Sequence, residues 1–203
     1  ENSPGARLYR PPLIVAAWEG DLNKVRALIE KGDDVNEIDG YQGRALNMAA
    51  AAGHTEIVEL LLAKGAKMER EGEQREAPVR SAAWMGQLAI VKLLLEKGAT
   101  LGPSLLHDAA KSDNVELVQF IMSKGIKVDD TIEGGDETAL TVASKWGALE
   151  AVKFLLKQGA NIEGSPGARV TPLCWANDRE HRKVAAFLEK AGANKRCMAP
   201  MRR

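Results

Sequence analysis

Hydrophobic and small residues recur along this chain with one spacing. A Pro, Ala or Leu at positions 12, 45, 78, 105, 139 and 172 is followed 20 residues later by a glycine, and by an alanine after four residues. A short apolar run precedes each glycine, with apolar groups at i, i+3 and i+4 as in Val58, Leu61 and Leu62. This spacing predicts an amphipathic helix, which we expect to end in a left-handed cap at each glycine. The glycines are Gly32, Gly65, Gly98, Gly125, Gly159 and Gly192.

The repeat period and the local motifs resemble the ankyrin repeat. Successive glycines lie 33, 33, 27, 34 and 33 residues apart, and the stretch from Gly53 to Ala66 reads GHTEIVELLLAKGA. A tetratricopeptide array would need a Trp-x-x-Leu-Gly pattern, which we do not see. The resemblance implies an all-α solenoid in one domain, 1–203. Its six helix-turn-helix repeats with hairpin loops would span about 11–43, 44–76, 77–103, 104–137, 138–170 and 171–194, before a basic tail at 195–203.

The connection between the third and fourth repeats, GATLGPSLLHDAA, is six residues shorter than the others. We expect a shortened hairpin there, and therefore a notch in the row of loops. The notch could admit a bulky ligand group, or it could be a tolerated deletion. Both interpretations are left open by the sequence.

Composition narrows the classes of partner and the compartment. The chain has 28 basic and 28 acidic residues, so no global field favours nucleic acid or an anionic membrane. Two cysteines, the lack of a glycosylation sequon and the lack of a long apolar stretch favour a reducing compartment. We expect an intracellular, cytoplasmic protein, with the nucleus not excluded. The chain begins at Glu1 without methionine or a signal-like segment, as a part of a longer protein would.

The aromatic residues fall into two groups. The three phenylalanines, Phe120, Phe154 and Phe187, lie five residues before their glycines, and we expect them in the core. Trp18, Trp84 and Trp146 instead occupy the two positions after an Ala-Ala or Ala-Ser pair. The resemblance implies that these positions lie at the exposed end of the inner helix, on a concave recognition surface. Trp175 is expected to belong to the cap of the last repeat.

We therefore predict a surface that binds a peptide or protein partner carrying apolar and some acidic groups. Exposed Trp beside Arg is the composition of an interface hot spot, and Arg80 is placed to stack on Trp84. The alternatives are that each indole closes a packing gap and that each charge is simply solvated. The predicted binding residues are Trp18, Tyr41, Arg44, Arg75, Arg80, Trp84, Met85, His107, Asp108, Lys111, Lys145 and Trp146.

No catalytic or metal-binding pattern stands out. His107 and Asp108 are adjacent rather than mutually oriented, and three scattered histidines with two cysteines give no ligand spacing. We expect no enzyme activity, cofactor or metal. The alternative is small-molecule binding or catalysis in a groove pocket near Trp84, His107 and Asp108. The resemblance also implies a structural role for His54, and it makes Asn36 a match to the asparagine that hydroxylases modify in related repeats.

Overall fold

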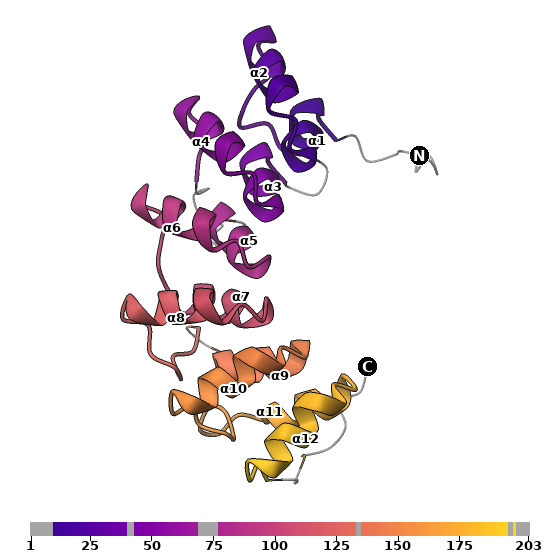
Figure 1. The fold of residues 1–203 in the computed structure, drawn as a ribbon, viewed down its shortest axis with the longest axis vertical. Coiled ribbons are helices and arrows are strands. Elements are labelled where there is room, and N and C mark those ends of the chain that lie inside the picture. Colours follow the sequence, from indigo (N-terminus) through magenta and orange to yellow (C-terminus); the bar gives the residue numbers. More distant parts are fainter. Residues whose placement is uncertain (1–9, 40–42, 69–76, 133–134, 195–196, 198–203) are drawn as a thin grey trace, which may run out of the picture. The chain divides into compact units, whose positions relative to one another are not determined.

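The chain folds into pairs of antiparallel helices (Figure 1). The computed structural model describes residues 10–39, 43–68, 77–132, 135–194 and 197, which hold twelve helices and no strand. The all-α repeat architecture is thereby confirmed. The helix pairs are α1 (Pro12–Glu19) with α2 (Leu22–Lys31), α3 (Ala45–Ala52) with α4 (Thr55–Ala63), α5 (Pro78–Trp84) with α6 (Leu88–Glu96), α7 (Pro103–Lys111) with α8 (Val115–Ser123), α9 (Ala139–Trp146) with α10 (Leu149–Lys157), and α11 (Pro172–Asp178) with α12 (Arg182–Lys190).

The chain divides into two compact units, Glu1–Thr100 and Leu101–Arg203. The N-unit holds α1 to α6 and the C-unit holds α7 to α12, and each is described by itself. The boundary falls within the shortened connection between the third and fourth repeats. The notch and the single continuous array therefore stay predictions.

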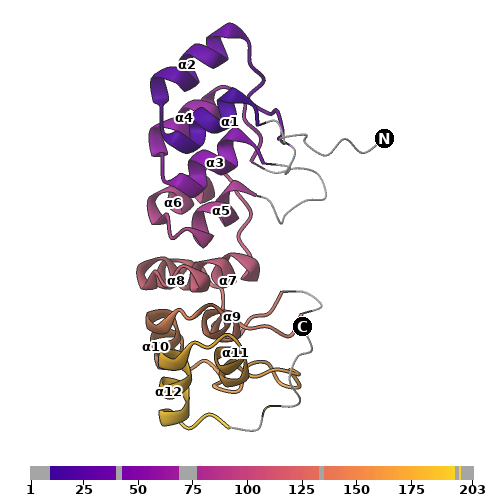
Figure 2. The same ribbon diagram turned by 90° about the vertical axis from the view of Figure 1, so that its right-hand side faces the viewer.

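Within each unit the first helices of consecutive repeats pack against one another. We call them inner helices: α1 packs on α3 and α3 on α5 in the N-unit, and α7 packs on α9 and α9 on α11 in the C-unit. Each inner helix also packs on the outer helix that follows it. Figure 2 shows the inner helices of each unit in one row and the outer helices in another.

The inner helices approach closely because alanines line their contacts. Ala16 and Ala17 of α1, and Ala49 and Ala50 of α3, are fully enclosed. Alanine has no side chain beyond Cβ, so the backbones of adjacent helices can come together without a cavity. The same paired alanines recur as Ala82 and Ala83 in α5 and as Ala109 and Ala110 in α7.

The glycine after each outer helix adopts the left-handed conformation predicted from the sequence. Gly32 has φ 105° and Gly125 has φ 99°, values that an L side chain rarely adopts. At the other end, the Asp21 carboxylate accepts a hydrogen bond from a backbone N–H in the first turn of α2. The Asn114 amide oxygen accepts one in the same way in the first turn of α8. These contacts satisfy amide donors that lack a partner within the helix.

The loops are linked from one repeat to the next by polar side chains. The Asn36 amide oxygen accepts from the Lys67 backbone N–H at 2.8 Å, and its Nδ2 donates to the Gly65 carbonyl at 3.1 Å. The Asp129 carboxylate accepts in the same way from the Asn161 N–H, at 3.1 and 3.2 Å. Asn36 thus has a structural role; its hydroxylation stays a prediction.

The phenylalanines lie at the edge of the core rather than inside it. Phe120, Phe154 and Phe187 are only half-buried, whereas the residue after each is fully enclosed. The expectation that the phenylalanines form the core was therefore wrong, because the core position is the next residue in each helix. The buried stripe of the outer helices in the C-unit passes through Ile121, Leu155 and Leu188.

Cys174 and Cys197 form a disulfide bond. The two cysteines therefore no longer support a reducing compartment, because disulfides persist in oxidising surroundings. Among the described residues, none of the helices has both the length and the apolar composition needed to span a bilayer.

Replacing Leu155 by alanine should lower the free energy of unfolding by about 2–5 kcal/mol, since it leaves a cavity in a fully enclosed site. Leu156→Ala is the matched control, because the neighbouring side chain is only half-buried and its loss should cost less than half as much. Urea unfolding followed by circular dichroism gives both values. Equal losses would contradict the position of the buried stripe.

Candidate partner-binding surface

Two tryptophans of the N-unit end inner helices that flank a third. Trp18 lies in the last turn of α1 and Trp84 ends α5, and their exposed fractions are 45% and 47%. α3 packs between these helices, and its residue at the equivalent position is the small Ala51. We call Trp18, Ala51, Ala52, Trp84 and Met85 the N-unit aromatic surface. Met85, which follows Trp84, is 53% exposed.

The last turn that carries Trp18 is fixed by a contact from the next repeat. His54 Nε2 lies 3.1 Å from the Trp18 carbonyl oxygen, and because a carbonyl can only accept, Nε2 must carry the proton. His181 makes the same contact to the Lys145 carbonyl at 3.1 Å, and Gln87 Nε2 reaches the Ala51 carbonyl at 3.3 Å. The structural role implied for His54 is thus one of a repeated set.

A glycine makes room for each of these bridging side chains. A Cβ on Gly20 would lie 2.5 Å from His54 Cε1, and one on Gly147 would lie 2.6 Å from His181 Nδ1. Gly20 and Gly147 also have φ near 80° and 77°, where glycine is favoured. The glycine after the inner helix is therefore required twice, by its backbone conformation and by the packing of the next repeat.

Two of the predicted binding residues in the N-unit are arginines. Arg44 directly precedes α3, and Arg80 lies one turn before Trp84 in α5; both are half-buried. Gly43, directly before Arg44, donates its backbone N–H to the buried Asp39 carboxylate at 2.8 Å, and the same carboxylate accepts from Arg10 Nε at 3.1 Å. Sequence reasoning missed this pair, because the two residues lie 29 positions apart. The Arg80–Trp84 stacking stays a prediction.

Tyr41 and Arg75, also predicted to bind the partner, lie outside the described residues. The remaining predicted residues belong to the C-unit.

In the C-unit, basic groups lie over indole rings. Lys111 Nζ is 5.6 Å from the centre of the Trp146 ring, and Lys145 Nζ is 4.1 Å from that of Trp175. The Arg179 guanidinium carbon is 5.6 Å from the Trp175 ring as well. Such distances allow cation–π attraction. We call these five residues the C-unit cation–aromatic surface.

Carboxylates balance these cations. Glu137 accepts from Lys145 at 2.7 Å, and Asp178 lies 3.5 Å from Arg179. Trp146 remains 48% exposed. Trp175 belongs to a surface cluster, a role that the sequence did not predict, because its neighbour Lys145 comes from α9, whereas Arg179 directly follows α11.

His107 and Asp108 are buried, contrary to their place in the predicted binding surface. Their exposed fractions are 3% and 1%. His107 Nε2 donates to the Asp130 carbonyl at 3.1 Å, and the Asp108 carboxylate accepts from Lys111 Nζ at 3.1 Å. Both side chains thus support the C-unit from within, and we leave them out of the candidate surface.

Burial also sets the protonation of His107. Loss of solvation lowers the pKa of His107, although the hydrogen bond to Asp130 and the nearby charges of Asp108 and Glu137 act in the opposite direction. Desolvation is the largest of these effects. Among the described residues, no group of three or more His, Cys, Asp or Glu side chains could hold a metal ion.

Comparison with known proteins places the whole described array in one family. The family model described as ankyrin repeats in three copies matches residues 13–104 and again 106–199. The crystal structure of the human ASB11 ankyrin repeat domain superposes with a TM-score of 0.73 and 29% sequence identity, covering 92% of this chain and 86% of that one.

Curated relatives are much longer than this chain. Glycerophosphocholine phosphodiesterase GDE1 of Eremothecium gossypii is 36% identical over 93 residues, which are 45% of this chain and 7% of that protein. The nuclear factor NF-kappa-B p105 subunit of Gallus gallus is 26% identical over 188 residues, or 92% of this chain and 17% of that protein. The chain thus spans a small part of either relative.

Removing the His54 side chain should loosen the end of α1 that carries Trp18. We expect His54→Ala to lower the free energy of unfolding by about 1 kcal/mol, the usual net value of one hydrogen bond. His54→Gln should cost less, because Gln87 serves the same purpose one repeat later. Urea unfolding provides the measurement, and equal costs for the two variants would show that the contact to the Trp18 carbonyl is unimportant.

Acidification should destabilise the fold through His107. Because the folded-state pKa is lowered below the usual 6.5, this contribution to stability is fully present above pH 6.5 and is lost as the pH falls towards the folded-state value. The slope is at most about 1.4 kcal/mol per pH unit. Unfolding midpoints of wild type and His107→Gln between about pH 5.5 and 8 test this. The variant should show a flatter profile, and parallel profiles would contradict it.

Proposed function

This chain belongs to the ankyrin repeat family, and we propose that it binds a peptide or protein partner through the exposed ends of its inner helices. Ankyrin repeats are generally protein–protein interaction modules, and the fold is typically not itself catalytic. We propose in addition which face of this chain binds the partner and which residues make the contact. It rests on the position of the tryptophans.

The observation that carries the proposal is the equivalent placement of Trp18 and Trp84. Both indoles are almost half exposed, although tryptophan is highly buried on average. Both lie in the last turns of inner helices of one unit, and α3, which has the small Ala51 at the equivalent position, packs against both helices. A large exposed aromatic on a rigid helix end loses little side-chain freedom on binding, which is why such residues serve as anchors.

The spacing of the helices suggests the kind of segment that fits. Packed helices lie about 8–10 Å apart, so α1 and α5 are separated by roughly 20 Å across α3. A helix with its side chains is about 10–12 Å wide, which would fit over Ala51 and Ala52 between the indoles. We propose a partner segment with an apolar side facing α3 and acidic groups directed to Arg44 and Arg80.

The C-unit carries candidate contact residues of its own, among them Trp146 and Lys111. Because Lys111, Lys145 and Arg179 each have a carboxylate neighbour, this surface carries little net charge. It is therefore suited to a partner with mixed rather than purely acidic character. We do not propose the small-molecule site, since His107 and Asp108 are enclosed.

We further propose an intracellular location, because ankyrin repeat proteins are commonly intracellular. In a reducing compartment the disulfide would then represent one of two states of the Cys174 and Cys197 pair, rather than a permanent crosslink.

Trp18→Ala together with Trp84→Ala should abolish capture of the partner. The immobilised chain is incubated with lysate, retained proteins are identified by mass spectrometry, and the affinity of each for wild type and variants is then measured by calorimetry. Loss of one hot-spot indole costs about 2 kcal/mol, or roughly 30-fold in dissociation constant. Trp146→Ala, measured separately, reports the share of the C-unit.

Glu59→Ala is the matched control, because Glu59 is exposed on the outer helix α4. Circular dichroism must show that all variants are equally folded. A captured partner whose affinity is the same for wild type and the double variant would refute the proposed binding face.

A further inference from the structure

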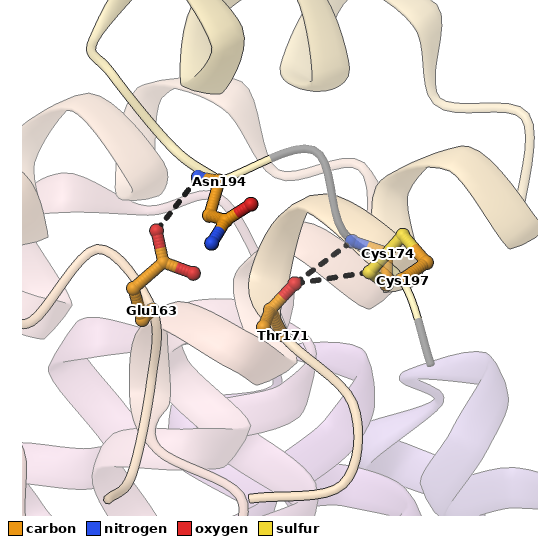
Figure 3. The surroundings of a disulfide bond; sticks show 5 residues. All are labelled: Glu163, Thr171, Cys174, Asn194 and Cys197. Atoms are coloured by element: carbon orange, nitrogen blue, oxygen red, sulfur yellow. Dashed lines mark hydrogen bonds between the residues drawn. A yellow bond between two sulfur atoms is a disulfide. The ribbon is translucent and has the colours of Figure 1, made fainter. Parts of the chain in front are cut away.

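The disulfide crosslinks the last described repeat across a whole helix. Cys174 lies in α11, and Cys197 lies 23 positions later, beyond the end of α12. The bond therefore closes a loop that contains all of α12 and returns the chain to the inner helix (Figure 3). Their Cα atoms are 5.5 Å apart, a separation typical of a disulfide.

The two sulfur atoms have different surroundings. Cys174 is only 8% exposed, whereas Cys197 is exposed. The Thr171 hydroxyl donates to Cys174 Sγ at 3.1 Å and accepts from the Cys174 backbone N–H at 3.3 Å, as Figure 3 shows. One side of the bond is thus enclosed and hydrogen-bonded, and the other faces solvent.

We propose that this pair is a thiol–disulfide exchange site in which an incoming thiol attacks the Cys197 sulfur. The attacking thiolate forms a new S–S bond to Cys197 while the bond between Cys197 and Cys174 breaks, and the electron pair goes to Cys174 Sγ, which then takes up a proton. When the reagent is a dithiol, its second thiolate attacks the mixed disulfide. The products are two cysteine thiols and the oxidised, cyclic dithiol. Two electrons move from the reductant to the protein.

Attack on Cys197 rather than on Cys174 follows from two properties of the bond: which sulfur a thiol can reach, and how well the other sulfur is stabilised as a leaving thiolate. Exchange rates depend on which sulfur can be reached and on how well the other sulfur carries negative charge as it leaves. Burial of Cys174 opposes the thiolate, whereas the Thr171 hydroxyl donates a hydrogen bond that strengthens as the charge develops. Thr171 is therefore a positioning residue that offsets the cost of releasing a thiolate into an enclosed site.

The repeat should loosen on reduction without unfolding. Leu188 and Val184 of α12 remain enclosed by other parts of the C-unit, and the Asn194 backbone N–H donates to the Glu163 carboxylate at 2.8 Å (Figure 3). The segment that follows Asn194 would lose its covalent tie to α11. Because Cys174 precedes Trp175, this tie ends directly beside the C-unit cation–aromatic surface.

The direction of attack can be read by peptide mapping of the full chain. The oxidised protein is treated briefly with glutathione, all free thiols are alkylated in acid, and the protein is digested with trypsin. Cleavage at Arg169, Arg179 and Arg196 places the two cysteines in separate peptides. We expect the glutathione adduct on Cys197 and the alkyl group on Cys174, in at least about tenfold excess over the reverse. An equal distribution, or adduct mainly on Cys174, would overturn the proposal.

The role of Thr171 is tested by a pair of variants and a dithiol. Reduction by dithiothreitol should be about fivefold slower in Thr171→Val, the factor expected for one lost hydrogen bond, and nearly unchanged in Thr171→Ser. The serine variant keeps both the hydrogen bond to Cys174 Sγ and the N-terminal cap of α11, and loss of that cap in the valine variant would open the bond to the reagent and speed reduction rather than slow it. Equal rates in both variants would refute the positioning role. If the valine variant does not fold, the peptide map of the wild-type chain still decides the direction of attack.

The existence of the bond is checked first by thiol titration of the unfolded, air-exposed chain. No free thiol is expected, and the melting temperature should fall on reduction and on Cys197→Ser by the same amount. Two free thiols per chain, or a melting temperature that reduction leaves unchanged, would overturn the proposal. Neither result would bear on the tryptophan-dependent binding.

Discussion

Close contact between inner helices, made possible by alanine pairs, is the constraint on which the rest of each unit depends. Ala16 and Ala17 are fully enclosed, as are their counterparts in α3, α5 and α7. A larger side chain at these positions would have to move adjacent backbones apart, and cores tolerate such overpacking poorly. The contact fixes the direction and spacing of the inner helices, and therefore where their last turns lie.

The candidate surface follows from this arrangement. The inner helices α1, α3 and α9 each end directly before a glycine, and a His or Gln from the next repeat donates to a carbonyl in the last turn. A side chain of one repeat thus holds the backbone of the preceding repeat at the end of its inner helix. Trp18 and Trp84 are thus held on a frame whose geometry is set by buried contacts, while the indoles themselves stay partly in solvent.

In the C-unit, buried hydroxyl groups pack in and beside α9. Thr138, Thr141 and Ser144 are fully or almost fully buried in the C-unit. The Thr138 hydroxyl caps α9 by accepting from the Thr141 N–H, and the Ser144 hydroxyl donates to the Leu140 carbonyl. Among the described residues, no fully buried side-chain polar atom lacks a hydrogen-bond partner, so these groups avoid the cost of an unsatisfied donor or acceptor. Polar contacts of this kind favour one arrangement over near alternatives.

The sequence by itself determined the repeat fold and the glycine caps, because these follow from spacing within one repeat, and its resemblance to ankyrin repeats implied the exposure of Trp18, Trp84 and Trp146. It did not determine which polar residues are buried: His107 and Asp108 look like surface groups in the chain, and only packing against neighbouring helices encloses them. It predicted that the three phenylalanines are buried, whereas the buried residue is the next one along each outer helix. The rotation of an outer helix about its axis is set by contacts with the next repeat. The pairing of Cys174 with Cys197, and of Lys145 with Trp175, was decided by tertiary structure alone. These partners come from different helices or loops, and their distance in space depends on how the repeats stack.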